Sequence, residues 1–270
     1  MKNKAIAYPY VGWMALFVVA PILIITVYAF TSSDWSFTTE NFRDMTLYST
    51  AFGRSFLLAA VATVICLLIG YPLAYFLARE TGWVHRMATM LIMLPMWMNF
   101  LLRTYSWQFL LERNGLINLF FGFFGLGPFQ MIDTQGAIVL GMVYNFLPYM
   151  VLPIFSVIEK IDRRVIEAAQ DLGADSVTVF RRVTFPLSLP GVLSGITMVF
   201  IPSVSTFAIS GLLGGNKILL LGNLIDMQFL GNAYNPHLGS AISLVMMVVV
   251  MVCIGLMNRF GEGEEGVAVL

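Results

Sequence analysis

Six long apolar stretches divide this chain, and each is about as long as a lipid bilayer is thick. They cover residues 11–30, 55–78, 87–110, 136–158, 187–213 and 240–260. An α-helix rises about 1.5 Å per residue, so about 20 residues cross a hydrocarbon core of about 30 Å. Unpaired backbone N–H and C=O groups are not tolerated in lipid, which makes helices the expected solution. The sequence therefore predicts an all-α integral membrane protein with six transmembrane helices.

The composition agrees with this interpretation. Only 11% of the residues are charged, whereas a typical globular domain carries about 25%. Charged residues are concentrated in short connections between the long apolar stretches, and we treat residues 1–270 as a single transmembrane domain. The first stretch follows Lys2 and Lys4 as a signal peptide would, but its length and the lack of a small-residue cleavage site favour a permanent helix. Cys66 and Cys253 lie inside apolar stretches and are interpreted as packing residues.

The Lys and Arg residues of the connections predict the orientation. One side receives ten of them: Lys2, Lys4, Arg79, Arg86, Lys160, Arg163, Arg164, Arg181, Arg182 and Arg259. The other side receives four, Arg43, Arg54, Arg113 and Lys217, and Arg103 lies inside a stretch. Because cytoplasmic loops carry the excess of Lys and Arg, both termini are predicted to be cytoplasmic. The connection between the fourth and fifth stretches is then cytoplasmic as well.

That connection, residues 159–186, is a polar island in an otherwise apolar chain. It contains the sequence Glu167-Ala168-Ala169-Gln170-Asp171-Leu172-Gly173. We expect a short amphipathic helix over residues 163–172, ended by Gly173, which is free to adopt a positive φ. Asp175 or Ser176 can cap a second short helix, and Pro186 is expected to break the chain before the fifth stretch. From the residues alone, two interpretations stay open: a knob that fits a groove on a partner, or an amphipathic loop that covers lipid headgroups.

The spacing of this motif resembles the signature of ABC-importer permeases, in which Glu-Ala-Ala is separated from a Gly by three residues, with a Pro just before the next span. Glu167, Ala168, Ala169, Gly173 and Pro186 match it. Further stretches are similar to the permeases of spermidine/putrescine importers: residues 70–78, 94–99, 103–105, 156–162, 214–217 and 221–223. The resemblance implies a type I ABC-importer permease in a bacterial cytoplasmic membrane, with cytoplasmic coupling helices.

The resemblance also implies a division of labour. A cytoplasmic ATPase dimer would grip the coupling residues, for which we name Glu167, Ala168, Ala169, Asp171, Gly173 and Phe180. A second, homologous permease would complete the channel in the bilayer, and an extracytoplasmic binding protein would deliver the substrate. The chain contains no Gly-rich phosphate loop, so ATP and Mg would be used by the partner ATPase, and this subunit is expected to be non-catalytic and to hold no cofactor. We expect no metal site and no nucleic-acid partner.

Candidate pathway residues lie in three stretches: Trp97, Asn99, Arg103, Tyr105, Tyr144, Asn145 and Ser205. Ionisable groups inside a span usually face a wet cavity, although Arg103 could instead reach outward to headgroups. Asn145 could equally hydrogen-bond a neighbouring helix. Pro202 is expected to interrupt the hydroxyl-rich fifth stretch near Ser205, as in the broken helices of transporter pathways.

A polyamine cargo has one difficulty, because a polycation favours carboxylates and aromatic faces. The apolar stretches contain no acid, and Glu112, Asp133 and Asp226 are expected at the external edge, Asp226 within a polar loop over residues 214–239. The companion permease could supply acids, aromatic side chains could bind the cations, or the cargo could be another organic cation, an amino-acid-like solute, sulfate or an iron chelate. An ion-coupled carrier would place Asp, Glu or His inside the spans, yet His85 and His237 lie in connections. A membrane enzyme would need a catalytic constellation that the sequence does not show.

Overall fold

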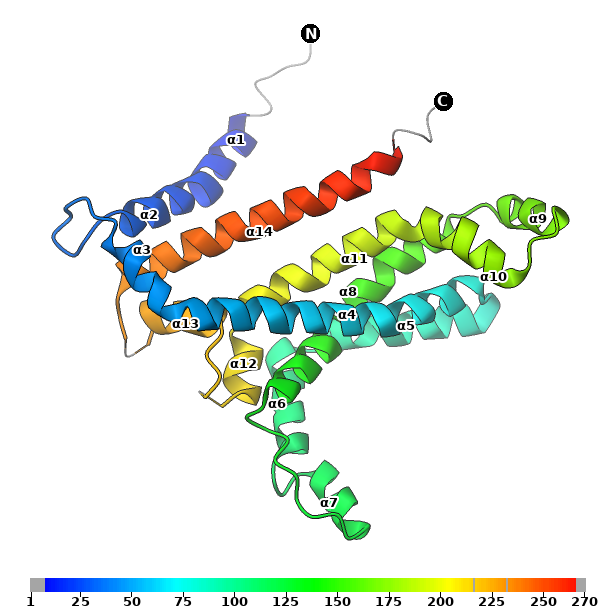
Figure 1. Cartoon of the computed structure of the whole chain (residues 1–270), viewed down its shortest axis with the longest axis horizontal. Helices are drawn as coiled ribbons and strands as arrows, with labels where there is room; N and C mark the ends of the chain where they lie inside the picture. The colour runs from blue at the N-terminus through cyan, green and yellow to red at the C-terminus, as the bar shows by residue number, and fades with distance from the viewer. Residues whose placement is uncertain (1–7, 216, 232, 266–270) are drawn as a thin grey trace.

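The computed structural model describes residues 8–215, 217–231 and 233–265. This part of the chain is helical, with a single β-bridge between Thr31 and Phe37 (Figure 1). In chain order the elements are α1 (Tyr8–Met14), the π-helix η2 (Ala15–Val19), α2 (Ala20–Ala29), α3 (Glu40–Met45), the 3₁₀-helix η3 (Thr46–Tyr48), α4 (Ser49–Arg79), α5 (Gly82–Trp97), α6 (Phe100–Leu111), α7 (Leu116–Phe123), α8 (Gln135–Glu159), α9 (Arg163–Asp171), α10 (Ser176–Val179), the π-helix η4 (Phe180–Thr184), α11 (Phe185–Ser205), α12 (Ala208–Leu213), α13 (Leu221–Phe229) and α14 (Pro236–Glu265).

The core lies where α8 packs along α4 and α11. Ile138, Met142 and Met150 of α8 are fully buried there. Glycine lets the helices approach closely: a Cβ atom on Gly191 of α11 would lie 2.9 Å from the carbonyl oxygen of Pro153 in α8. Small residues at such crossings are the usual way for membrane helices to gain packing contacts. The three helices therefore form the tightly packed centre of the molecule.

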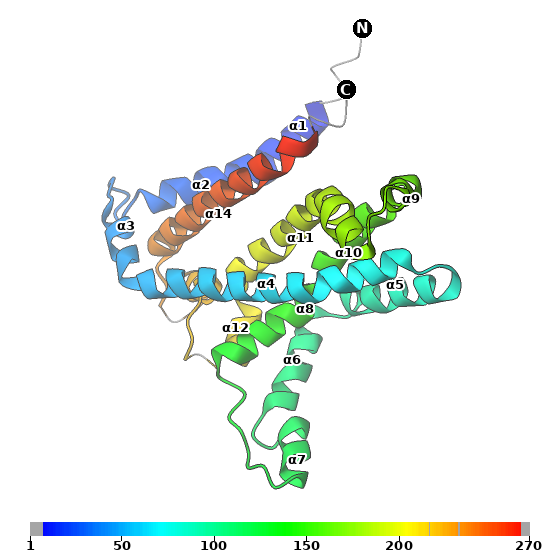
Figure 2. The same cartoon turned by 45° about the vertical axis from the view of Figure 1, so that its right-hand side comes forward.

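A second pair of long helices lies beside this core. The first span, α1 to α2, packs against α14, and the two run side by side in both views (Figures 1 and 2). Within the described residues, five helical segments are long and apolar enough to cross a membrane, and a bent pair provides the sixth. The predicted all-α, six-span architecture is confirmed in this form.

The bent pair corrects the prediction for residues 87–110, which is not one straight helix. Helix α5 ends at Trp97, α6 begins at Phe100, and the pair is bent by 92°. Asn99 causes the break, because its Oδ1 accepts hydrogen bonds from the backbone N–H groups of Leu101 at 2.9 Å and Leu102 at 3.3 Å. Helices α6 and α7 consequently point away from the long helices (Figures 1 and 2).

Two predictions about proline were wrong. Pro186 does not break the chain, since Ser176 to Ser205 is one continuous helical segment. The π-turn η4 just before it widens the helix, with Phe185 N–H bonded to Phe180 O, so the proline ring has room within the helix. Pro202 does not interrupt α11 either, and the break falls after Ser205, where Thr206 is extended.

Candidate coupling segment and translocation pathway

The segment formed by α9, α10 and η4, called here the coupling segment, extends beyond the ends of α8 and α11 (Figure 1). Helix α9 begins where Asp162 Oδ1 accepts a hydrogen bond of 2.9 Å from Arg164 N–H. It ends at Gly173, whose φ of +86° suits a residue without a Cβ atom. The backbone N–H of Ala174 then bonds to Ala169 O at 3.1 Å, which closes the helix end. The helix over residues 163–172 and its glycine stop were thus predicted correctly.

Asp175 caps the second short helix, as expected, with Oδ1 accepting a hydrogen bond of 3.2 Å from Thr178 N–H. The hydrogen bonds with Thr178 lower the pKa of the Asp175 carboxyl below its usual value. One turn later, the Phe180 ring packs edge-on against Tyr75 and Tyr71 of α4, with ring centroids 5.2 Å and 5.9 Å apart. Phe180 therefore anchors the segment to the core rather than facing outward.

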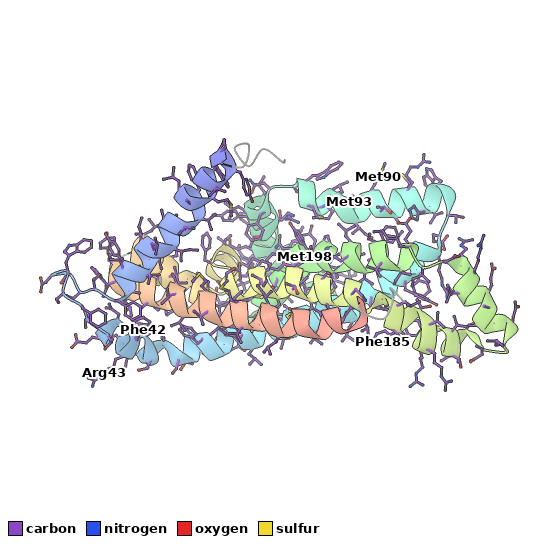
Figure 3. All side chains as sticks on the ribbon, turned by 90° about the horizontal axis from the view of Figure 1, so that it is seen from above. Phe42, Arg43, Met90, Met93, Phe185 and Met198 are labelled. Atoms are coloured by element: carbon purple, nitrogen blue, oxygen red, sulfur yellow. The ribbon has the colours of Figure 1, made fainter. Side chains whose placement is uncertain are left out.

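The remaining predicted coupling residues lie on the surface of the segment. Glu167, Ala168, Asp171 and Gly173 are exposed, and Ala169 is half-buried. No residue of α9 is buried. Phe185, at the start of α11, lies near one end of the bundle, whereas Phe42 and Arg43 of α3 lie at the opposite end (Figure 3). The bundle thus presents the Glu-Ala-Ala motif at one end, open to a binding partner.

The predicted pathway residues of the third stretch fall into three different environments. Trp97 ends α5 and is 86% exposed, whereas Asn99 caps α6 with its side-chain oxygen Oδ1. Arg103 of α6 is only 6% exposed, and its Nε and Nη1 atoms have no hydrogen-bond partner in the described part of the chain. A buried guanidinium without acceptors is costly. The bend therefore separates Trp97 from Arg103, whereas Asn99 and Arg103 remain one turn apart, since the backbone N–H of Arg103 donates a hydrogen bond of 3.1 Å to Asn99 O.

Aromatic packing joins α6 to α8. The Trp107 and Tyr144 rings meet edge-on with centroids 5.4 Å apart, and Tyr144 is 36% exposed. Asn145, beside Tyr144, is buried, and its Nδ2 donates a hydrogen bond of 2.9 Å to Gly141 O within the same helix. Ser205 likewise donates within its own helix, to Ile201 O at 3.2 Å.

A pocket of about 310 Å³ lies between α6, α12 and α13, and we call it the α13 pocket. Tyr105 of α6 and Asp226 of α13 both line it. Asn223, one turn before Asp226, accepts a hydrogen bond from the Ser210 hydroxyl and donates one of 3.0 Å to Phe207 O. A carboxylate, an amide and an aromatic ring thus converge on one space, at the end of the bundle opposite α9 (Figure 1).

Sequence reasoning missed this role for Asp226, because it expected a polar loop over residues 214–239. That expectation was wrong: the segment contains α13, whose Leu221 and Leu224 are buried. The backbone N–H of Leu221 donates a hydrogen bond of 2.8 Å to Ser55 Oγ of α4, which ties α13 back to the bundle. The spacing of Leu221, Leu224 and Gln228, all buried on one helix face, was the available signal.

The family comparison agrees with this architecture. The family model described as "binding-protein-dependent transport system inner membrane component" matches residues 70–261, and the chain belongs to this family of transporter subunits. The spermidine/putrescine transport system permease protein PotB of Haemophilus influenzae is 36% identical over 258 residues, which is 92% of this chain and 90% of that protein. PotB of Escherichia coli is 37% identical over 249 residues, covering 88% and 90%. A molybdenum transport system permease, ModB of Mycobacterium bovis, is 30% identical over 77% of this chain and 78% of ModB.

Solved structures show the same fold. A bacterial ABC transporter that imports the acidic polysaccharide alginate aligns with a TM-score of 0.83 at 15% identity, over 96% of this chain and 94% of that chain. An inward-facing methionine ABC transporter, MetNI, aligns with a TM-score of 0.64 at 17% identity, over 82% and 97%. The predicted type I ABC-importer permease fold is therefore confirmed.

Proposed function

We propose that this chain is a membrane permease subunit that moves spermidine and putrescine through an ATP-driven importer by alternating access. The observation that carries this choice of cargo is the 36–37% identity, over about nine-tenths of the chain, to permeases of spermidine/putrescine transport systems. The α13 pocket supports it, because Asp226 supplies a carboxylate for an ammonium group and Tyr105 supplies an aromatic face. The acid that the apolar stretches lack is thus provided by a helix that folds back onto the bundle.

The proposal includes the partners of such an importer. An ATPase dimer binds the exposed face of α9 around Glu167 and Ala168, and a second homologous permease completes the channel. A binding protein delivers cargo at the α13 end; one related structure contains a periplasmic binding protein with its oligosaccharide. ATP and Mg are used by the ATPase, so this subunit is non-catalytic. The excess of Lys and Arg on the α9 side supports a cytoplasmic position for α9 and for both termini in a bacterial cytoplasmic membrane.

The test is uptake of radiolabelled spermidine and putrescine by cells that lack their own polyamine import and express this chain with its neighbouring genes. We expect ATP-dependent uptake that disappears when this chain is omitted. Asp226→Asn should raise KM about tenfold, because the pocket loses its charge, and Asp34→Asn on an exposed connection should leave KM unchanged. An assembled importer without polyamine uptake would disprove the cargo, and an unchanged KM in Asp226→Asn would remove the α13 pocket from the pathway.

One observation favours a second candidate, an importer of a small oxyanion. The buried Nε and Nη1 atoms of Arg103 are charged hydrogen-bond donors without a partner among the described residues, and an anion would supply acceptors for them. A molybdenum transport permease is also among the relatives. Uptake of molybdate and sulfate in the same cells decides between the two, and Arg103→Lys should abolish anion uptake while sparing polyamine uptake.

A further inference from the structure

A second cavity, of about 520 Å³, lies behind the coupling segment, and we call it the coupling-side cavity. Its walls come from four helices and a turn that are distant in sequence. Tyr75 and Glu80 line it at the end of α4, His85 at the start of α5, Glu159 at the end of α8, and Glu167 on α9. Its volume falls within the range of about 300–1,000 Å³ that is usual for small-molecule sites. It is separate from the α13 pocket, which shares none of these residues.

Some charged side chains in this cavity have a partner within the chain and others do not. The guanidinium of Arg79 lies over the Tyr75 ring, with Cζ 4.2 Å from the ring centroid. Glu159 Oε1 lies 3.7 Å from His85 Nε2. Glu80 and Glu167 form no ion pair with the described residues, although Arg163 also lines the cavity. Two carboxylates of the wall are therefore available to a cation.

A buried hydroxyl gives an independent sign of a ligand. Thr184, on the π-turn η4, lines the same cavity and is only 1% exposed. Its Oγ1 has no hydrogen-bond partner in the described part of the chain. Buried polar atoms are nearly always hydrogen-bonded, so a hydroxyl left without a partner in the wall of a cavity indicates an atom supplied from outside the chain.

We propose that the coupling-side cavity binds a linear aliphatic polyamine from the α9 side of the membrane. Ammonium groups pair with Glu80 and with Glu167, so that a bound polyamine competes with the ATPase for Glu167, and an N–H group donates to Thr184 Oγ1. The inference rests on the proposed polyamine cargo, because it assigns that cargo class a second site on the product side.

Occupancy of this cavity has a mechanical consequence. A polyamine that bridges Glu80 and Glu167 ties α9 to the turn between α4 and α5. Helix α9 has no buried residue, so few contacts of its own hold it against the bundle. A polyamine bridge would therefore restrict its position strongly. A ligand that binds one position of α9 better than another shifts the population toward that position. Imported polyamine would then slow further import.

The binding test uses the complete importer in nanodiscs, without the binding protein, and equilibrium dialysis of radiolabelled spermidine. All variants carry Asp226→Asn, so that the α13 pocket does not contribute. We expect Glu80→Gln to weaken binding about tenfold and Thr184→Val to weaken it severalfold. Glu40→Gln, an exposed carboxylate on α3, is the matched control and should bind as the parent does. Equal binding by Glu80→Gln, Thr184→Val and the control would overturn the proposal, as would no binding at all.

The transport test uses the importer with Asp226 intact in vesicles preloaded with ATP, with or without spermidine on the ATPase side. Spermidine preloaded on the ATPase side should slow the initial uptake rate severalfold in the parent importer and much less in Glu80→Gln. Normal uptake that preloaded spermidine does not slow would refute the inhibitory effect of the second site and leave the cargo proposal standing. Absent uptake in an assembled importer would refute the cargo, while the dialysis experiment still decides whether the cavity binds spermidine.

Discussion

Helix α8 and the coupling segment are neighbours in sequence, yet they are held in place by different means. In α8, 56% of the most apolar 18-residue stretch is buried, whereas α9 has no buried residue. Contacts with α4 and α11 hold α8, while α9 and α10 keep their shape through Asp162, Gly173 and Asp175. A core held by packing resists change, and a segment held by local caps leaves its surface free for a partner.

The largest expected effect contrasts a glycine in the core with one on the surface. Gly191→Ala places a Cβ atom 2.9 Å from Pro153 O and 3.0 Å from Ile154 Cα, and backbone atoms cannot easily move aside. We expect destabilisation of about 1–3 kcal/mol. Gly12→Ala on α1 meets nothing within 4 Å and should be neutral or slightly stabilising, since alanine favours helix. Thermal unfolding in detergent measures both, and equal shifts would contradict the close packing of α8 and α11.

The second prediction strains the coupling segment without touching the core. Gly173→Val puts a β-branched residue at φ +86°, at a cost of about 1–2 kcal/mol, although space is open around it. We expect normal insertion but at least tenfold less ATP-dependent uptake, because the α9–α10 turn is distorted. Gly125→Val, at φ +72° and also in open space, applies similar strain beyond α7. If both variants lost uptake equally, the special role of the α9–α10 turn would be disproved.

The third prediction concerns a polar link inside the core. The Tyr71 hydroxyl of α4 lies 2.8 Å from Ser188 Oγ of α11, and Ser188 donates its own proton to Phe185 O. Tyr71 is therefore the donor, and Tyr71→Phe should cost about 1 kcal/mol. In a double-mutant cycle with Ser188→Ala, the two losses should be less than additive. Full additivity would show that the bond contributes nothing to the pairing of α4 and α11.

The smallest expected effect is a pH dependence confined to α10. The pKa of Asp175 is lowered in the folded chain, so its contribution is present above the unfolded pKa of 3.8 and is lost as the pH falls through the folded value. Hydrogen exchange of residues 176–179 should therefore speed up as the pH is lowered below about 4, after correction for the intrinsic rate. Asp175→Asn still caps the helix and should remove this dependence. The same dependence in Asp175→Asn would assign it to another group.

Several features of the structure could be read from neighbouring residues alone. The α9 helix, the stop at Gly173 and the cap at Asp175 follow from rules that span one turn of helix. Asn99 after Pro95 was also a local signal for the break between α5 and α6, but the continuous hydropathy of residues 87–110 hid it. For Pro186 and Pro202 the local signal was misleading instead. Proline usually interrupts a helix, but the surrounding helix accommodates both rings.

The sequence by itself determined the membrane class, the apolar spans and the exposed Glu-Ala-Ala helix, because hydropathy, helical period and capping act over a few residues. Only the tertiary structure decided that Asp226 and Tyr105 line one pocket, and that Glu80, Glu167 and Thr184 line one cavity. Those arrangements depend on contacts such as Leu221 N–H with Ser55 Oγ, between residues 166 positions apart. Such contacts exist only once α4, α8 and α11 have packed, since packing is what brings the distant segments together.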